Sequence, residues 1–217
     1  MLEMGRTGVT RRKWRNIGAS LMLGLFVAFL DRINLSVALP QLSKDMGFAG
    51  DRFALTSSWA LTILLVGYSV ANIAGGIATR RLDPKVIAIW SVIIWSVATV
   101  AIALTSSIAV LLGCRLMLGL AQGVYWPQQS RFAQAWFAPQ ELTKANSVIQ
   151  YYGLYLALAI GFVVLTPIYD AFGWRFLFFL TGSLGLLIVA PLYAVMLKPE
   201  VESPHAAQPV PSRGWWK

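Results

Sequence analysis

The chain has 217 residues, of which 57% are hydrophobic and only 12% are charged, a composition that excludes an ordinary soluble domain. The formal net charge of +9 does not indicate nucleic-acid binding, because the basic residues form short clusters between long apolar runs. No phosphate-binding glycine-rich loop, metal-ligand cluster or nucleophile–base pair is visible. The lone cysteine, Cys114, lies in an apolar run, and the lone histidine, His205, lies in a polar tail. We therefore expect a membrane protein that is not an enzyme and needs no cofactor or metal.

The N-terminal segment 1–15 is basic, and a long apolar run follows it. Its charges are Arg6, Arg11, Arg12, Lys13 and Arg15. Positive flanks of this kind stay in the cytoplasm. The apolar run is longer than the core of a signal peptide and lacks a convincing small-residue cleavage site. We therefore expect a cytoplasmic N-terminus and a first membrane helix that is retained.

The apolar runs predict six helices, each long enough to cross a bilayer with about 20 residues. The expected fold is an all-α membrane protein, with a six-helix transmembrane bundle over 16–198. The expected helices cover about 16–40, 54–78, 86–104, 108–132, 145–169 and 176–197, and the connections include 41–53, 79–85, 105–107, 136–141 and 170–175.

The distribution of Lys and Arg predicts the orientation of this bundle. About thirteen of the eighteen lie in the N-terminal segment, in the second–third and fourth–fifth connections, and in the tail. The opposite connections hold only Lys44, Arg52 and Arg175. Both termini are therefore expected in the cytoplasm. The proline-rich segment 199–217 is expected to be a cytoplasmic linker that begins a central loop. Its Gly214–Lys217 end resembles the start of a further segment; a short interfacial anchor is the alternative.

Two charged residues, Asp31 and Arg32, stand side by side within the first apolar run. A charge near the middle of a bilayer costs from about 2.5 to more than 10 kcal/mol, so it normally faces a protein interior or a watery cavity. Neighbours on a helix point about 100° apart, so these two cannot simply pair with each other. Asp31 is the one acid expected inside a span, and so the one carboxylate there that could carry a proton. The alternative is that both charges pair with other helices and hold the bundle together.

A second polar cluster lies in the fourth run. Arg115, Gly119 and Gly123 recur every four residues and share one face, and the two glycines have the spacing that lets helix backbones approach closely. Gln122 follows Arg115 by two turns and lies on the same side. Arg32, Arg115 and Gln122 are therefore expected to converge on a central cavity. Two guanidiniums there would suit a carboxylate through bidentate hydrogen bonds.

Tyrosines add further candidates. Tyr68 in the second helix, and Tyr151, Tyr152 and Tyr155 in the fifth, could offer hydroxyl groups, although each also fits a packed interfacial ring. The candidate substrate-binding residues are Arg32, Asn34, Tyr68, Arg115, Gln122 and Tyr155; Asp31 is the candidate for proton coupling, and Gly119 and Gly123 are the candidates for helix packing.

The chain resembles the major facilitator superfamily and, within it, the anion:cation symporters, such as bacterial hexuronate, galactonate, tartrate and phthalate carriers. The resemblance runs from Trp14 to about Pro199. It is carried by Leu30–Ala38, by the Arg115-x-x-x-Gly119-x-x-x-Gly123 pattern, by 127–131 with Trp136-Phe137, and by 172–175.

This resemblance implies alternating access by two six-helix halves, each built from two inverted three-helix repeats. It also implies that Arg32 contacts the substrate carboxylate and that Asp31 takes part in proton or cation coupling. Tyr68 and Arg115 then line the site. Three features depart from the pattern: many proton-coupled members have a glutamate where this chain has Gln122, Arg80 lies near the position of a usual aspartate, and the length matches only an N-terminal half.

We therefore expect the N-terminal half of a secondary active transporter for small organic anions, such as sugar acids or other carboxylates, in a bacterial inner membrane. Its expected partners are the anion, a coupling proton or cation, the lipid bilayer, and a missing C-terminal half or second protomer, with no nucleic acid. Two alternatives stay open: a six-helix carrier that works as a homodimer, and a non-transporting membrane sensor or interaction subunit.

Overall fold

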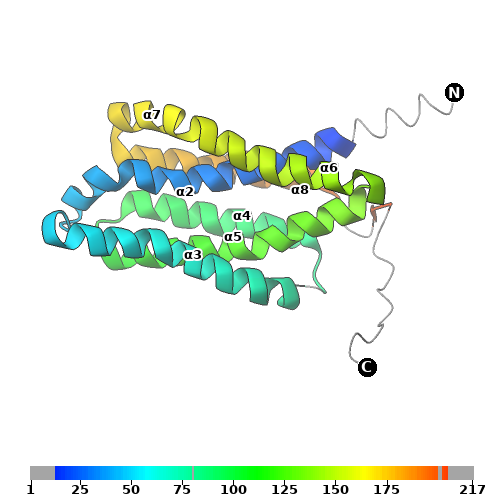
Figure 1. Cartoon of the computed structure of the whole chain (residues 1–217), viewed down its shortest axis with the longest axis horizontal. Coiled ribbons are helices and arrows are strands. Elements are labelled where there is room, and N and C mark those ends of the chain that lie inside the picture. Colours follow the sequence, from blue (N-terminus) through cyan, green and yellow to red (C-terminus); the bar gives the residue numbers. More distant parts are fainter. Residues whose placement is uncertain (1–12, 80, 200–201, 205–217) are drawn as a thin grey trace.

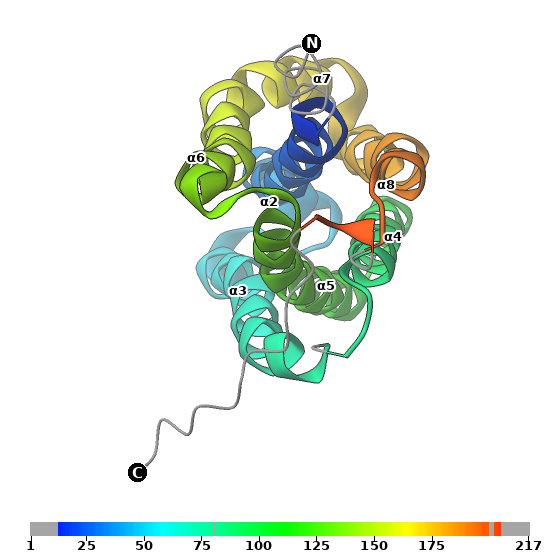
Figure 2. The same cartoon turned by 90° about the vertical axis from the view of Figure 1, so that its right-hand side faces the viewer.

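The computed structural model describes residues 13–79, 81–199 and 202–204. Long helices lie side by side along the long axis of the molecule (Figure 1), and the end-on view shows α2 among the other helices (Figure 2). The α-helices are α2 (Ala19–Asp45), α3 (Phe53–Ala78), α4 (Pro84–Leu104), α5 (Ile108–Trp136), α6 (Leu142–Asn146), α7 (Gly153–Leu184) and α8 (Ala190–Met196). Shorter 3-10 turns lie at Gly50–Arg52 and Pro139–Glu141, and π-helical turns at Trp14–Gly18, Ser147–Tyr152 and Gly185–Val189.

Five helical segments of the described residues are long and apolar enough to cross a membrane, so six separate spanning helices are not confirmed. The last of the five, Pro139–Met196, covers both regions expected to hold the fifth and sixth helices. The reason lies at Gly173, whose φ of 79° and ψ of 173° are not helical. This residue forms a kink inside α7, and the two helices on either side of it are joined without a loop. A positive φ is easily adopted by glycine because it has no Cβ. The chain reverses its direction there without a separate loop (Figure 1).

Two predicted helix ends were wrong. The first helix continues through Pro40 to Asp45, where the Gln41 amide donates to the Asp45 carboxylate at 2.8 Å, a pair at helical spacing that supports the extra turn. The fourth helix continues past Pro127 to Trp136. Most of the basic N-terminus, Arg80, His205 and nearly all of the expected linker lie outside the described residues.

The packing places α5 between α3 and α4, and α2 against α7. Buried apolar side chains from α2, α4, α5 and α8 form one core cluster. The outer faces of the long helices are apolar as well, as on α3, where Leu55, Trp59, Val70 and Ile73 are exposed. An apolar exterior around helices whose backbone groups bond internally is the arrangement that lipid requires.

Candidate functional site

Arg32 lies at the centre of the candidate site, on α2. Its Nε donates to the side-chain oxygen of Gln122 on α5 at 2.8 Å. Its guanidinium carbon is 4.6 Å from the ring centroid of Phe29 and 4.7 Å from that of Tyr68 on α3. Two aromatic rings and one amide thus hold this cation, since a guanidinium is attracted to ring faces within about 6 Å.

Two side chains of α5 reach the backbone of α2 around this point. The Gln122 amide nitrogen donates to the carbonyl of Ala28 at 3.2 Å, and the Arg115 Nη1 donates to the carbonyl of Asp31 at 3.1 Å. Gln122 and Arg115 are both buried. Among the described residues, neither Arg32 nor Arg115 forms an ion pair with a carboxylate. Both cations therefore rely on neutral partners for their hydrogen bonds.

The Asp31 side chain is fully buried beside this cluster. The polar neighbours of its carboxylate are the Thr181 hydroxyl and the Arg115 guanidinium. Asn34, one turn further along α2, donates to the Thr181 hydroxyl on α7 at 2.9 Å. The polar groups of α2 thus face three helices: Arg32 meets α3 and α5, and Asn34 meets α7.

The predicted tyrosines separate. Tyr68 belongs to the Arg32 cluster, whereas Tyr155 is 61% exposed on α7 and stacks on Tyr151 with ring centroids 6.2 Å apart. No contact recorded for residues 13–79, 81–199 and 202–204 joins Tyr155 to Arg32. Sequence reasoning missed Phe29 and Thr181. The spacing of Phe29, three residues before Arg32 on one helix face, was a usable signal, but no sequence signal points to Thr181.

Gly119 and Gly123 lie against α3. A Cβ built on Gly119 would collide with the backbone carbonyl of Leu64, and one on Gly123 would collide with that of Tyr68. The glycines therefore bring the α3 backbone close to α5, while Arg115 and Gln122 on the same helix turn toward α2.

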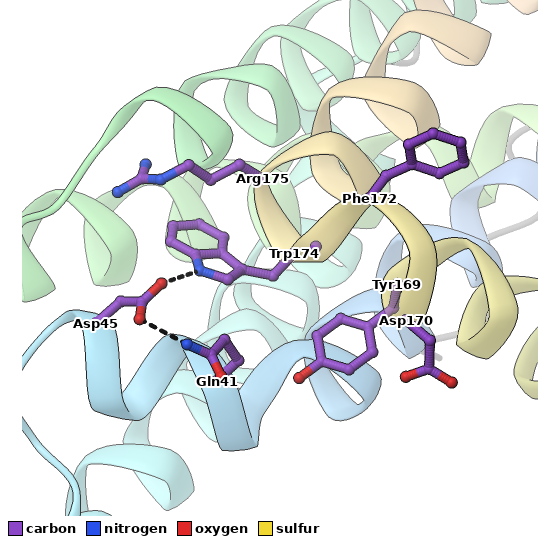
Figure 3. A pocket seen from close by; sticks show the side chains of 8 residues that line it. Gln41, Asp45, Tyr169, Asp170, Phe172, Trp174 and Arg175 are labelled. Carbon is purple, nitrogen blue, oxygen red and sulfur yellow. Dashed lines mark hydrogen bonds between the residues drawn. The ribbon is translucent and has the colours of Figure 1, made fainter.

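A separate depression of about 520 Å³ opens at the end of the bundle where α2 meets the kink of α7 (Figure 3). The indole N–H of Trp174 and the amide of Gln41 both donate to the Asp45 carboxylate, at 2.7 and 2.8 Å. Asp45 is exposed beyond the apolar stretch of α2. The bond from Trp174 has the larger effect and that from Gln41 the smaller one, and both lower the pKa of the Asp45 carboxyl group. Arg175 also lines the depression and donates to the carbonyls of Ala103 and Thr105, at the end of α4. These bonds join three parts of the bundle and make the region a structural junction.

The described residues contain no group of three or more His, Cys, Asp or Glu side chains that could hold a metal ion. The Arg32 cluster brings one half-buried and one buried guanidinium group together with a buried amide, and guanidinium groups are the side chains that can donate paired hydrogen bonds to an anion.

The family model of the Major Facilitator Superfamily matches residues 21–215. The chain belongs to this superfamily. It is 30% identical to the probable sulfoacetate transporter of Cupriavidus necator, over 94% of this chain and 47% of that protein. It is 29% identical to the probable galactarate/D-glucarate transporter of Escherichia coli (86% and 42% of the two chains) and 28% identical to the hexuronate transporter of Bacillus subtilis (77% and 38%). The chain thus spans less than half the length of these three superfamily relatives.

Among solved structures, this superfamily member is similar to a bacterial homolog of the human lysosomal transporter Spinster, in an inward-facing and occupied conformation. The TM-score is 0.70 at 18% identity, over 88% of this chain and 45% of that one, and this likeness concerns the fold. The predicted resemblance to the superfamily and to its anion transporters is confirmed. The protein is a multi-pass membrane protein of a transporter superfamily, not an enzyme.

Proposed function

We propose that this chain is the N-terminal six-helix half of a secondary active transporter for small organic anions, such as sugar acids and other carboxylates. The observation that carries the proposal is Arg32, a cation inside the bundle whose hydrogen-bond partner is neutral and which has no carboxylate paired with it among the described residues. A charge at this depth is costly and marks a substrate or ion pathway by default. The relatives include sulfoacetate, glucarate and hexuronate transporters, and this supports an organic anion as the substrate.

Coupling to protons or another cation is assigned to Asp31. Its carboxyl group is buried next to Arg115, where uptake or release of a proton would change the charge balance of the site. In the proposed cycle, a second six-helix half supplies the other wall of the site, and the two halves of inverted repeats rock around it.

The proposed orientation puts the basic segment 1–15 and the linker 199–217 in the cytoplasm of a bacterium, with the bundle 16–198 in its inner membrane. The bias of Lys and Arg toward these segments supports it. A fluorescent protein fused after residue 198 should fluoresce, and alkaline phosphatase fused there should be inactive; the reverse pattern would contradict the orientation.

The deciding experiment is uptake by cells that express the complete reading frame containing this chain. Radiolabelled glucuronate, glucarate and sulfoacetate are the probes. Arg32→Ala should reduce uptake at least tenfold while leaving the amount of protein in the membrane unchanged, because the anion loses its counter-charge. Arg15→Ala, at an exposed arginine near the N-terminal end of the bundle, is the matched control. Uptake by Arg32→Ala at the parental rate would refute the role of Arg32.

The same reading frame distinguishes the architectures. Six further hydrophobic spans after Lys217 would support one half of a two-half carrier. A stop codon there would favour the homodimer, and cross-linking in membranes would then test for the second protomer.

A further inference from the structure

We propose that Gln122 is a positioning residue that fixes Arg32 through a neutral amide, so that the hydrogen-bond partner of this cation never neutralises its charge, whatever the pH. The inference rests on the proposed function and concerns the same site. It identifies Gln122 as the residue that holds the substrate-binding Arg32, and it predicts that this partner adds no titrating group to the site.

The geometry of Gln122 determines the direction of its amide. The oxygen accepts from Arg32 Nε at 2.8 Å, and the nitrogen donates to the Ala28 carbonyl at 3.2 Å. If the amide were reversed, its NH2 group would face the guanidinium, and two donors would oppose each other. The Ala28 carbonyl is also the helical acceptor for the backbone N–H of Arg32, four residues later. One buried amide therefore binds both the side chain and the backbone turn of Arg32.

The bond to Gln122 occupies the Nε side of the Arg32 guanidinium, while Phe29 and Tyr68 lie against it. The two Nη groups form the remaining edge of the fork. Paired N–H groups of this kind match the two oxygens of a carboxylate or the oxygens of a sulfonate. We therefore assign the Nη edge of Arg32 to the acid group of the substrate.

The charges around this pair come from three helices. Asp31 and Arg32 lie on α2, Tyr68 on α3, and Arg115 on α5; from α7, the described neighbour is the uncharged Thr181. Gln122 adds no charge to this set. A protonated glutamate at the same position could accept from Arg32 and donate to Ala28 as the amide does. Once ionised, it would cancel the charge that the substrate needs and could no longer donate to Ala28.

The test compares Gln122→Glu with Gln122→Met in the full-length protein, purified in lipid nanodiscs. Binding of glucuronate, glucarate and sulfoacetate is measured between pH 5 and 8.5, with size-exclusion profiles as the check on folding. Each Kd is divided by the wild-type Kd at the same pH, which removes the contribution of Asp31. For Gln122→Glu, we expect a ratio within threefold of one at pH 5 and at least ten at pH 8.5. For Gln122→Met, which lacks both hydrogen bonds, we expect a ratio of about ten that does not vary with pH.

Two results would overturn the inference while leaving the proposed function intact. One is a ratio for Gln122→Glu that does not change with pH, and the other is wild-type affinity in Gln122→Met. If the wild-type protein binds none of the three anions, the proposed function itself fails, and the inference fails with it.

Discussion

Helix α5 meets its two neighbours α3 and α2 in opposite ways. Toward α3 it presents Gly119 and Gly123, which leave no room for a Cβ between the two backbones. Toward α2 it presents Arg115, Gln122 and Gln129, which recur every seven residues and donate to the carbonyls of Asp31, Ala28 and Leu21, the last at 3.3 Å. The backbones of α3 and α5 are in close contact, whereas those of α2 and α5 hardly approach each other.

The difference concerns how each interface can respond to a ligand. Two helices whose backbones touch are held by short-range van der Waals packing, which is favourable at only one distance between the helices. Long polar side chains bridge a gap, and they can keep or exchange their acceptors when the gap changes. The α2 carbonyls that accept these bonds also take part in the helix itself, so losing a side-chain donor does not unfold the turn. We therefore expect α3 and α5 to move as one body and α2 to be the helix that adjusts.

The largest effect is expected at the glycine interface. Gly119→Ala places a methyl group against the Leu64 carbonyl and should destabilise the protein by about 3 kcal/mol, at the upper end of the usual cost of overpacking. Gly113→Ala, on the same helix, is the matched control: a Cβ there has no atom within 4 Å, so stability should be unchanged or rise by up to about 1 kcal/mol from helix propensity. Thermal unfolding in detergent measures both. Equal losses in the two variants would remove the distinction between the interfaces.

A smaller effect is expected from the polar side chains of α5 that bond to α2. Gln129→Leu removes the bonds to the Leu21 carbonyl and to the Tyr125 hydroxyl, which lies 2.9 Å from the amide nitrogen. The loss should be about 2 kcal/mol, since the usual net value is about 1 kcal/mol for each of the two hydrogen bonds. Gln134→Leu, at an exposed position of α5, should leave the melting temperature unchanged. A loss for Gln129→Leu as large as that for Gly119→Ala would mean that α2 is held as rigidly as α3.

The smallest effect is expected at the end of α2. Because the bonds from Trp174 and Gln41 lower the pKa of Asp45, its stabilising contribution is complete above the pKa of the unfolded chain. It is lost as the pH falls through the lower value of the folded protein. Asp45→Asn should therefore lower the melting temperature slightly at pH 7 and show a smaller further drop than wild type on acidification to pH 3. Asp51→Asn, at the neighbouring exposed acid, is the control and should leave the melting temperature at pH 7 unchanged.

The sequence predicted the spanning regions well because about 20 consecutive apolar residues are a strong signal. It failed at Gly173, where one residue with a positive φ replaces a loop, and at Asp45, where polar residues continue a helix. In the candidate site, heptad spacing placed Arg115 and Gln122 on one side of α5, as the structure shows. Spacing cannot rank tyrosines on different helices, so Tyr155 was named with Tyr68 although only Tyr68 contacts Arg32. The partner of each polar group depends on side-chain directions and on the distance between helices, which no single helix pattern contains.

The bonds that secure α2 have a consequence for biosynthesis. Lys13, just ahead of α2, pairs with Glu141 at 2.6 Å, 128 residues later in the chain, and Asn34 bonds to Thr181, 147 residues later. At a synthesis rate of about 5–20 residues per second, the first helix to leave the ribosome waits roughly 6–26 s before Glu141 exists. The partners of Arg32, Tyr68 and Gln122, are made within that interval, whereas Thr181 is made after it. The helix that is made first therefore completes its contacts only when the second half of the chain has been made.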